Sequence, residues 1–152
     1  MAHSGGAFAH TLGSSAMAAD ILAHDWTSSF GPVDVWPRWL KAAAAMVLRC
    51  PAPMALLCGA DGVLLYNDGY RTIVGPRHPA VLGVGVCAAW PEAAEFNRGV
   101  LRQVLAGASL SYREQPFLLD TDGASEERWF DLDYSPLFDD AGAPCAVLAL
   151  VT

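Results

Sequence analysis

The sequence has 152 residues, of which 53% are hydrophobic and 16% are charged. This length fits a single domain. A chain so rich in apolar residues buries enough surface to offset the entropy cost of folding, which excludes intrinsic disorder of the whole. Nine Lys and Arg residues against sixteen Asp and Glu residues give a net charge of −7. That sign argues against binding to nucleic acid or to an anionic membrane surface, since both require a basic face.

Cysteine usage and the N-terminus indicate the compartment. The four cysteines are widely spaced, with no C-x-x-C pair and no histidine at metal-ligand spacing: Cys50, Cys58, Cys87 and Cys145. We therefore expect free thiols and no metal site. The N-terminus lacks the basic and apolar regions of a secretory signal. No apolar run comes close to the length of a membrane span, which is about 18 residues. The sequence predicts a cytoplasmic protein that does not insert into membranes.

The first third of the chain predicts a tail followed by helices. Residues 1–15 are small and polar, which predicts a flexible tail. A short helix is predicted from Ala16, and a second helix follows, with Asp34 as its N-cap and Pro37 in its first turn. This second helix carries one apolar stripe at helical spacing. The stripe consists of Trp36, Trp39, Leu40, Ala43, Met46 and Val47.

The pattern then changes to strands. Apolar runs over 54–58 and 63–66, joined by a Gly-rich turn, predict a β-hairpin. Residues 69–74 predict a short helical piece, and residues 77–91 are dense in Pro and Gly, which predicts short turns. Regular apolar spacing over 96–105 predicts an amphipathic helix.

Three more strands are predicted towards the C-terminus. Residues 109–119 read as extended, with Pro116 indicating a bulge or an edge strand. Residues 120–126 predict a polar loop. Residues 128–134 alternate between two faces, and residues 144–151 are nearly all apolar, so each segment predicts a strand.

Two strands, a helical crossover and a three-strand meander predict an α+β fold. Its expected form is a five-stranded antiparallel sheet with the crossover helices on one face and an N-terminal helical extension. Short motifs follow the same order. They are Ala60-Asp61-Gly62 with the strand that continues to Asp68, then Tyr70, Gly75, His78-Pro79-Ala80-Val81-Leu82-Gly83, Trp90-Pro91-Glu92 and Trp129 to Pro136, with His24-Asp25-Trp26 and residues 31–37 upstream. On these motifs the chain resembles a PAS domain, of the type found at the N-terminus of bacterial sensor histidine kinases.

The resemblance implies three parts: a tail (1–15), a helical extension that serves as interface or cap (16–50) and a PAS sensory domain (51–152). No kinase His-box or nucleotide-binding segment accompanies them. The resemblance therefore implies a sensory module that regulates a downstream output domain, a histidine kinase. PAS domains often dimerise through such an N-terminal helix, so the apolar stripe of the second helix is the candidate interface of a homodimer. Whether that helix packs on its own chain or on a second protomer stays open.

Two cofactors of similar domains are disfavoured by the residues. Flavin photosensors of this fold carry a reactive cysteine in a G-x-N-C-R-F-L-Q stretch, whereas here Val86 occupies the cysteine position and Cys87 comes one place too late. Haem-binding relatives commonly use a histidine on the crossover helix, and residues 96–105 contain none. His78 is predicted to be a surface or turn residue. The G-x-G-x-x-A match at 83–88 lacks the flanking strand and helix of a dinucleotide site.

No catalytic residue is assigned. The chain has no G-x-S-x-G, H-E-x-x-H or P-loop motif. Asp131 and Asp133 share one face of a strand with Trp129, which is typical of a solvated outer face. A small enzyme on a similar scaffold would need a buried acid–base residue, and none is identified. We therefore expect no enzymatic activity in this chain.

A ligand pocket is expected between the concave face of the sheet and the short helices. Its candidate polar groups are Tyr66, Asn67, Tyr70, Arg71, Trp90 and Tyr134. Structural alternatives exist for three of them, with Asn67 as the N-cap of the next helix and with Trp90 and Tyr134 as core aromatics. A packed core without a ligand is the corresponding alternative for the whole chain, and it would leave a dimerisation module.

Overall fold

The computed structural model describes residues 6–121 and 123–152. The strands are β1 Met54–Cys58, β2 Val63–Tyr66, β3 Leu110–Thr121, β4 Ala124–Phe138 and β5 Pro144–Val151. The α-helices are α1 Gly6–Leu12, α2 Ala16–Ala23, α3 Arg38–Arg49, α4 Asp68–Val74, α5 Val86–Ala89 and α6 Ala94–Val104. Short 3₁₀ helices are η1 Val33–Val35, η2 Gly75–Arg77 and η3 Pro91–Ala93.

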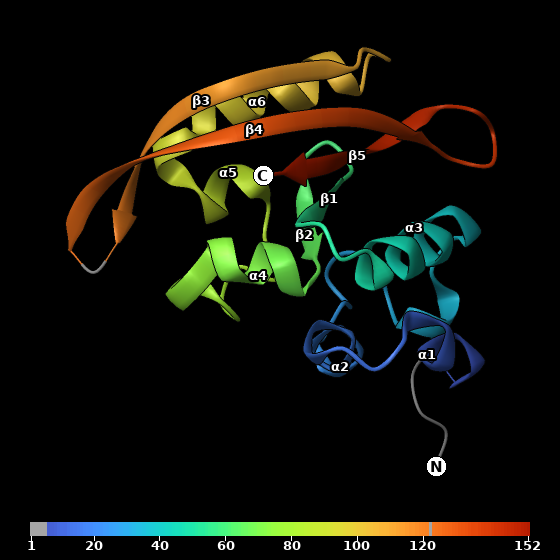
Figure 1. Cartoon of the computed structure of the whole chain (residues 1–152). Helices are drawn as coiled ribbons and strands as arrows, with labels where there is room; N and C mark the ends of the chain where they lie inside the picture. Colours follow the sequence, from blue (N-terminus) through green and yellow to red (C-terminus); the bar gives the residue numbers. More distant parts are fainter. Residues whose placement is uncertain (1–5, 122) are drawn as a thin grey trace.

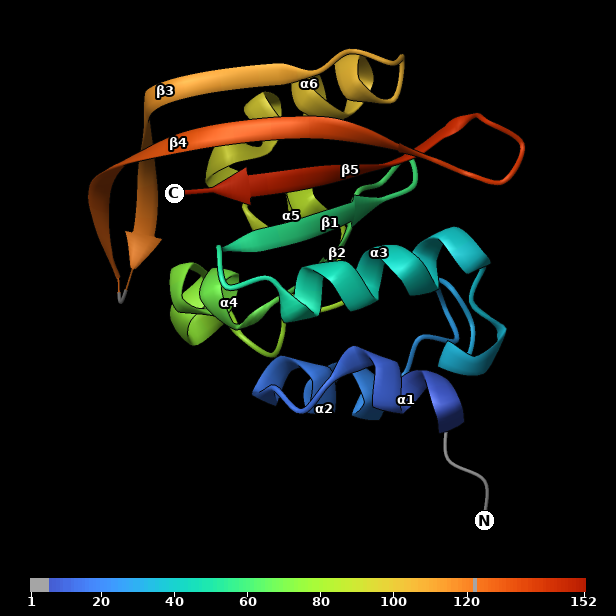
Figure 2. The same ribbon diagram turned by 45° about the vertical axis from the view of Figure 1, so that its right-hand side comes forward.

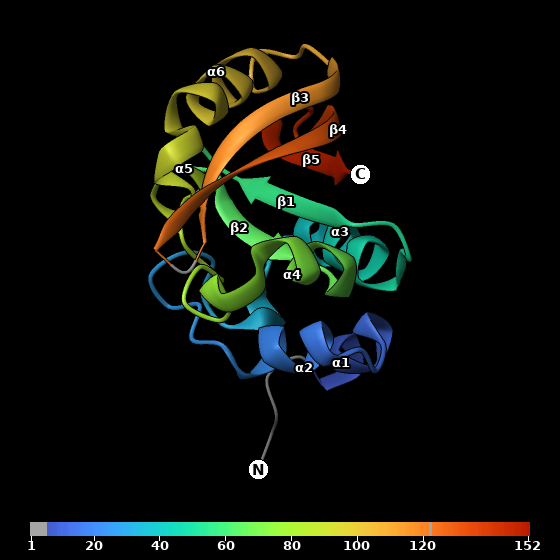
Figure 3. The same cartoon turned by 60° about the vertical axis from the view of Figure 1, so that its left-hand side comes forward.

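The strands form one five-stranded antiparallel sheet in the order β2-β1-β5-β4-β3. The central strand, β5, pairs with β1 on one side and with β4 on the other. Helices α4, α5 and α6 lie against one face of this sheet, with α6 beside β3 and β4 (Figure 1). Figure 3 shows α5 and α6 on that side and the N-terminal helices away from β3. The predicted α+β fold is confirmed.

The turn between β1 and β2 allows α5 and α6 to approach the sheet. Gly62 ends this turn with φ of +61°, a conformation that residues with a side chain rarely adopt. A Cβ atom at Gly62 would lie 2.9 Å from Val86 Cγ1 and 3.0 Å from Leu101 Cδ2. Glycine is therefore needed here for two reasons, and its absent side chain leaves room for Val86 to pack against the sheet.

The predicted polar loop over 120–126 is wrong for 120–121 and 124–126, which belong to β3 and β4; residue 122 lies outside the described residues. Asp120 lies opposite Ser125, whose hydroxyl donates to Asp120 Oδ1 at 2.9 Å. Gly123, at φ of +79°, supplies the left-handed residue of a tight turn. The polar residues of this segment therefore lie at the tip of an exposed β3–β4 hairpin, which bends towards α4 (Figure 1). Pro116 lies on the edge strand β3, close to a register shift, as the sequence predicts.

The chain is helical from residue 6, so the prediction of a flexible tail over 1–15 is wrong for residues 6–12; residues 1–5 lie outside the described residues. Phe8 and Leu12, four positions apart, give α1 an apolar face that packs on the core. The glycines at positions 5, 6 and 13 concealed this helix in the sequence. The helix predicted from Ala16 is confirmed as α2. Asp34 is not the N-cap of the next helix: it lies in η1, and α3 begins only after Pro37.

An aromatic cluster fixes the N-terminal helices on their own chain. Trp26 and Trp36 are 2% and 3% exposed, and their rings pack edge-on with centroids 5.5 Å apart. Phe30 stacks on Trp26 at 5.4 Å, and Phe8 meets Trp36 at 6.2 Å. Each indole N–H donates to a main-chain oxygen at 2.8 Å. Figure 2 shows the result, with α1 and α2 stacked beneath α3, which runs along β1.

This packing accounts for most of the predicted interface stripe. Trp36, Leu40, Ala43 and Val47 are buried within the chain, Trp39 is half-buried and Met46 is 48% exposed. Trp36 lies before α3 rather than on it, because η1 and Pro37 intervene. The helix therefore packs in cis.

No helix within residues 6–121 and 123–152 is long and apolar enough to cross a membrane. In the same residues no three His, Cys, Asp or Glu side chains gather as a metal ion would require. The four cysteines are free thiols.

Candidate ligand-binding site

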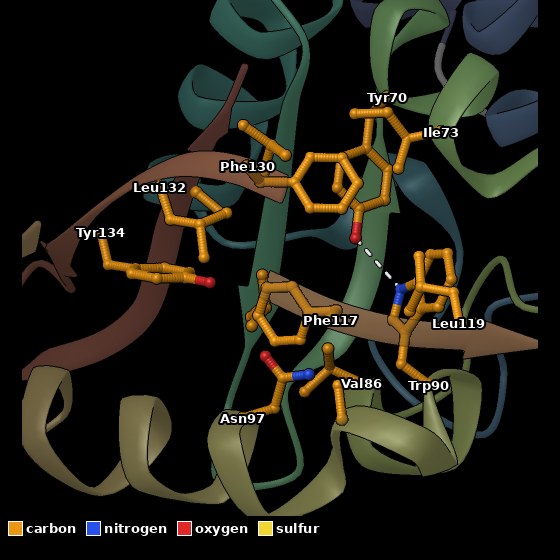
Figure 4. Close-up of a pocket in the computed structure, with 14 residues that line it drawn as sticks. Tyr70, Ile73, Val86, Trp90, Asn97, Phe117, Leu119, Phe130, Leu132 and Tyr134 are labelled. Atoms are coloured by element: carbon orange, nitrogen blue, oxygen red, sulfur yellow. Dashed lines mark hydrogen bonds between the residues drawn. The ribbon is translucent and has the colours of Figure 1, made fainter. Parts of the chain in front are cut away.

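A cavity of about 60 Å³ lies between the sheet and helices α4 to α6. The sheet contributes Leu57, Phe117, Leu119, Phe130, Leu132, Tyr134, Ala149 and Val151. The helical side contributes Tyr70, Ile73, Val86, Trp90, Ala93 and Asn97. Figure 4 shows these side chains converging from the two sides. Apolar walls with a few polar groups are typical of a small-molecule site.

Two tyrosines in the cavity wall are neutral hydrogen-bond donors. Tyr70 Oη accepts a hydrogen bond from Trp90 Nε1 at 3.2 Å (Figure 4). Burial raises the pKa of Tyr70 to about 12, and burial likewise raises the pKa of Tyr134, because a buried phenolate loses its hydration. Both hydroxyls therefore keep their protons at neutral pH. Since the Tyr70 oxygen is an acceptor towards Trp90, its own proton is available to a further partner.

Two other polar groups in the wall have no hydrogen-bond partner. Asn97 on α6 is 8% exposed and Tyr134 on β4 is 5% exposed, and neither side chain bonds to another residue of the described chain. Among the described side chains, no polar atom is fully buried without a hydrogen-bond partner. The polar atoms of Asn97 and Tyr134 are therefore accessible, and both residues line the cavity. Buried polar groups are normally hydrogen-bonded. This pair can therefore bond to a water molecule or a ligand in the cavity.

Asn97 is the site residue that the sequence analysis missed. It shares the buried face of α6 with Val100, Leu101 and Val104. A polar residue thus interrupts the apolar stripe of a helix that was otherwise predicted well. That interruption is the signal in the sequence, because a carboxamide on a core-facing position needs a partner.

The structure brings together three of the six predicted pocket residues, since Tyr70, Trp90 and Tyr134 line the cavity. Tyr66, Asn67 and Arg71 do not line it. The Arg71 side chain is 43% exposed and faces Asp20 at 3.8 Å. Each of the other two belongs to a hydrogen-bond network of its own.

Tyr66 belongs to a relay of hydrogen bonds between β2 and α2. Its Oη bonds to His78 Nδ1 at 2.6 Å, and His78 Nε2 bonds to Asp20 Oδ2 at 2.8 Å. The His78 side chain is 6% exposed. His78 lies in a turn, as predicted, but it is not a surface residue, because Tyr66 and α2 cover its ring. The relay fixes α2 to the sheet.

Asn67 is a structural residue. Its Oδ1 accepts from the N–H of Tyr70 at 3.0 Å, which confirms the N-cap alternative. The same side chain makes four further main-chain hydrogen bonds. Oδ1 accepts from Met54 N at 3.1 Å, and Nδ2 donates to the oxygens of Val47 at 3.0 Å, Cys50 at 3.1 Å and Ala52 at 2.8 Å. Every polar atom of Asn67 is thus occupied within the protein.

A second hollow, of about 390 Å³, adjoins the cavity, and the two share Ile73, Trp90 and Leu119. These three side chains form the partition between them. The hollow extends along 72–77 and reaches the β3–β4 hairpin at Asp120 and Arg128.

Arg77 clamps this side of the molecule. Its guanidinium bonds to the Glu92 carboxylate and to the main-chain oxygen of Asp120, and it lies 4.4 Å above the ring of Trp90. Glu92 in turn accepts from the Asp120 N–H at 3.0 Å. The hydrogen bond from Arg77 lowers the pKa of Glu92 to about 2. The clamp joins η2, η3 and the hairpin around Trp90.

The residues do not fit a flavin photosensor or a haem protein. Val86 lines the cavity, whereas Cys87 does not, and its thiol lies 3.5 Å from the Ala94 oxygen. Both ring nitrogens of His78 are engaged, by Tyr66 and Asp20, so neither is available to ligate iron. Reactive-cysteine and histidine–iron chemistry therefore have no suitable group in this wall.

A five-stranded antiparallel sheet with short helices enclosing a cavity on one face defines a PAS-like α+β domain. A family model described as "PAS fold" matches residues 50–152, and the chain belongs to this family. The family and the fold predicted from the sequence are thus confirmed. No curated protein matches the chain significantly.

Solved structures share the fold at low sequence identity. The LOV protein of Rhodobacter sphaeroides is 15% identical with a TM-score of 0.57, over 76% of this chain and 66% of that chain. The PAS domain of Bordetella pertussis BvgS is 20% identical with a TM-score of 0.54, over 74% and 83%. A domain of a sensory box sensor histidine kinase/response regulator from Geobacter sulfurreducens is 14% identical with a TM-score of 0.50, over 74% and 91%.

Proposed function

We propose that this chain is the cytoplasmic sensory module of a signalling protein. It binds a small molecule in the cavity and regulates a downstream output domain, a histidine kinase. Membership of the PAS family and the fold shared with a domain of a sensor histidine kinase support the signalling role. The observation that carries the ligand is the cavity itself, in which Asn97 and Tyr134 have no hydrogen-bond partner among the described residues. The chain has no catalytic role in this proposal.

Signalling requires a route from the cavity to the output domain. Ala149 and Val151 line the cavity and belong to the central strand β5. The next residue, Thr152, exchanges two main-chain hydrogen bonds with Asp131, of 2.8 and 2.9 Å. A ligand that displaces Val151 acts directly on this end of β5. It would shift the population between two arrangements of a segment attached there.

A small-molecule screen on the purified chain tests the proposal, with the midpoint of thermal unfolding as the readout and dissociation constants for the hits. A ligand of the folded state raises the midpoint as its concentration rises, by mass action. Two variants that fill the cavity, Ala93→Leu and Ala149→Leu, serve as controls and should abolish the shift. The proposal is wrong if no compound binds saturably, or if the hits bind the filled variants equally well.

A dimerisation module without a ligand is the second candidate, favoured by an exposed apolar pair. Trp129 on β4 and Leu118 on β3 are each 59% exposed, and they flank Pro116 on the face turned away from the cavity. Such patches mark contact surfaces, and a two-fold dimer buries the same patch on both copies. Light scattering of the parent and Trp129→Lys tests it. A dimer that the substitution dissociates, in a chain that binds no compound, would favour this candidate.

A further inference from the structure

Each of the open polar groups of the cavity can donate a hydrogen bond. The Tyr70 proton is free, because its oxygen accepts from Trp90. The Tyr134 hydroxyl has no partner in the described chain, and Asn97 offers two N–H donors beside one carbonyl oxygen. A ligand that presents an acceptor can therefore bond to any of these groups, and a carbonyl oxygen has lone pairs for two donors.

The site favours an uncharged ligand. The cavity wall, as formed by the described residues, contains no Asp, Glu, Lys, Arg or His, and an ion that enters an apolar cavity loses its hydration without a counter-charge. The adjoining hollow carries no net charge either. There Arg77 is paired with Glu92, and the remaining charged wall residues, Arg128 and Asp120, have opposite signs.

The shape of the two hollows limits how a ligand fits. A cavity that holds benzene has a volume of about 150 Å³, whereas this one has about 60 Å³ and the adjoining hollow about 390 Å³. In Figure 4, Trp90 and Leu119 lie at one side of the cavity and Tyr134 at the opposite side. The small polar end of a ligand therefore fits the inner cavity. A larger apolar part of the ligand fits only if the side chains of Ile73, Trp90 and Leu119, which separate the two hollows, move apart.

We infer that the cavity and the adjoining hollow together bind a neutral, mainly apolar molecule through a carbonyl oxygen. The carbonyl oxygen accepts hydrogen bonds from Asn97 and Tyr134, and the apolar body lies against Trp90 in the direction of the hollow. This inference rests on the proposed function and specifies the class of ligand.

Three probes of similar size separate the contribution of the carbonyl group to binding from the effect of a charge. Acetophenone carries a carbonyl, ethylbenzene lacks it, and benzoate adds a negative charge. NMR titration of the whole chain gives each dissociation constant. We expect acetophenone to bind about tenfold more tightly than ethylbenzene, the effect of a buried hydrogen bond, and benzoate not to saturate. Asn97→Leu and Tyr134→Phe should each lower the acetophenone affinity about tenfold and leave ethylbenzene unchanged. Tyr112→Phe, outside the cavity wall, is the matched control.

Asn97→Leu has a second readout that does not depend on a probe. It removes a carboxamide without a partner, so the ligand-free protein should unfold at a higher temperature. If Asn97 has a structural role, Asn97→Leu should unfold at a lower temperature than the parent, and this result would overturn the inference. Equal binding of acetophenone and ethylbenzene, or preferred binding of benzoate, would overturn the ligand class while the proposed function stands. If none of the three binds, the ligand class is wrong, and the screen with cavity-filling variants decides the proposed function separately.

Discussion

Asn67 holds three segments of the chain together through one buried carboxamide. The side chain is 1% exposed, caps α4, accepts from the first residue of β1 and donates to three main-chain oxygens over 47–52. An amide nitrogen carries two hydrogens, so the three oxygens share them. No other side chain type supplies two acceptor sites and two donors in this shape. Removing it leaves several buried backbone groups without a partner.

We predict that Asn67→Ala lowers the free energy of unfolding by about 3–5 kcal/mol, since each unpaired buried group costs about 1–3 kcal/mol. Asn67→Asp should be at least as unstable. Asp equals Asn as an N-cap, but its second oxygen would face the three main-chain oxygens that Nδ2 contacts. Urea unfolding of the parent and both variants measures the difference. An Asp variant as stable as the parent would show that only the cap matters.

The Arg77–Glu92 pair predicts a dependence of stability on pH. Arg77 lowers the pKa of Glu92 to about 2 in the folded protein, from 4.5 in the absence of structure. A carboxyl with a depressed pKa stabilises the fold above the unfolded value and loses this contribution as the pH falls through the folded value. The contribution of Glu92 should therefore be complete above about pH 5 and decline towards pH 2.

Glu92→Gln should lower the free energy of unfolding at pH 7 by about 1–2 kcal/mol, the effect of a hydrogen bond to a charged group that is largely buried. The parent should then lose more stability than the variant between pH 5 and pH 2. Chemical denaturation at several pH values measures both effects. Glu95→Gln is the matched control, because Glu95 is 90% exposed in its pair with Arg98, and such pairs contribute little. Parallel pH profiles for parent and Glu92→Gln would contradict the prediction.

The site could be predicted most directly where a regular pattern fixes the direction of a side chain. Strand alternation over 128–134 places Tyr134 on the inner face, and the structure has it there. Tyr66 ends its strand, and its orientation depends on His78, which is 12 positions away. Arg77 and Glu92 are 15 positions apart in a segment of turns, where no period relates one side chain to another.

At the scale of elements, substitutions in and next to α3 can show whether the N-terminal extension packs on its own chain. Trp36 is buried among Phe8, Trp26 and Phe30, whereas Met46 on α3 is 48% exposed. We predict that Trp36→Ala lowers the free energy of unfolding by about 3–5 kcal/mol through loss of packing. Met46→Ala should change it by less than about 0.5 kcal/mol, as at other surface sites.

Unfolding by urea and light scattering of the two variants distinguish packing in cis from packing between protomers. A Trp36→Ala variant that keeps its unfolding midpoint but dissociates from a dimer would show that the stripe belongs to a second copy. A variant that loses stability at every protein concentration supports the arrangement in Figure 2. The concentration dependence matters because an interface contributes to stability only through mass action.

Element types followed from the sequence where apolar residues form a continuous run or a regular period. The strands β1, β2 and β5 are apolar runs and α6 has a helical period, and all four were predicted close to their bounds. The failures at α1 and at the β3–β4 tip share a cause, because composition was used where spacing decides. Glycines suggested a tail at the N-terminus, yet the spacing of Phe8 and Leu12 gives α1 an apolar face. Polar residues suggested a loop between β3 and β4, yet Gly123 permits a tight turn.

At the scale of the whole molecule, the extension and the PAS part share one core. A single cluster of buried side chains runs from Leu12 in α1 to Val151 in β5. Polar contacts cross the same boundary, among them Asp20 with His78, Asp68 with the Met17 N–H, and Asn67 with the α3 end. Neither part has a separate hydrophobic core. The extension is therefore part of the folding unit, although the family match begins at residue 50.

We predict one cooperative unfolding transition for the whole chain. Calorimetric and van't Hoff enthalpies should agree, as they do for a two-state domain of this size. Native-state hydrogen exchange gives the sharper test, because it reports on each part separately. Amides in the centre of α3 and of β5 should open with the same free energy, close to the global value, and Asp20→Asn should lower both equally. Exchange of α3 through an opening well below that of β5 would show that the extension detaches while the sheet stays folded.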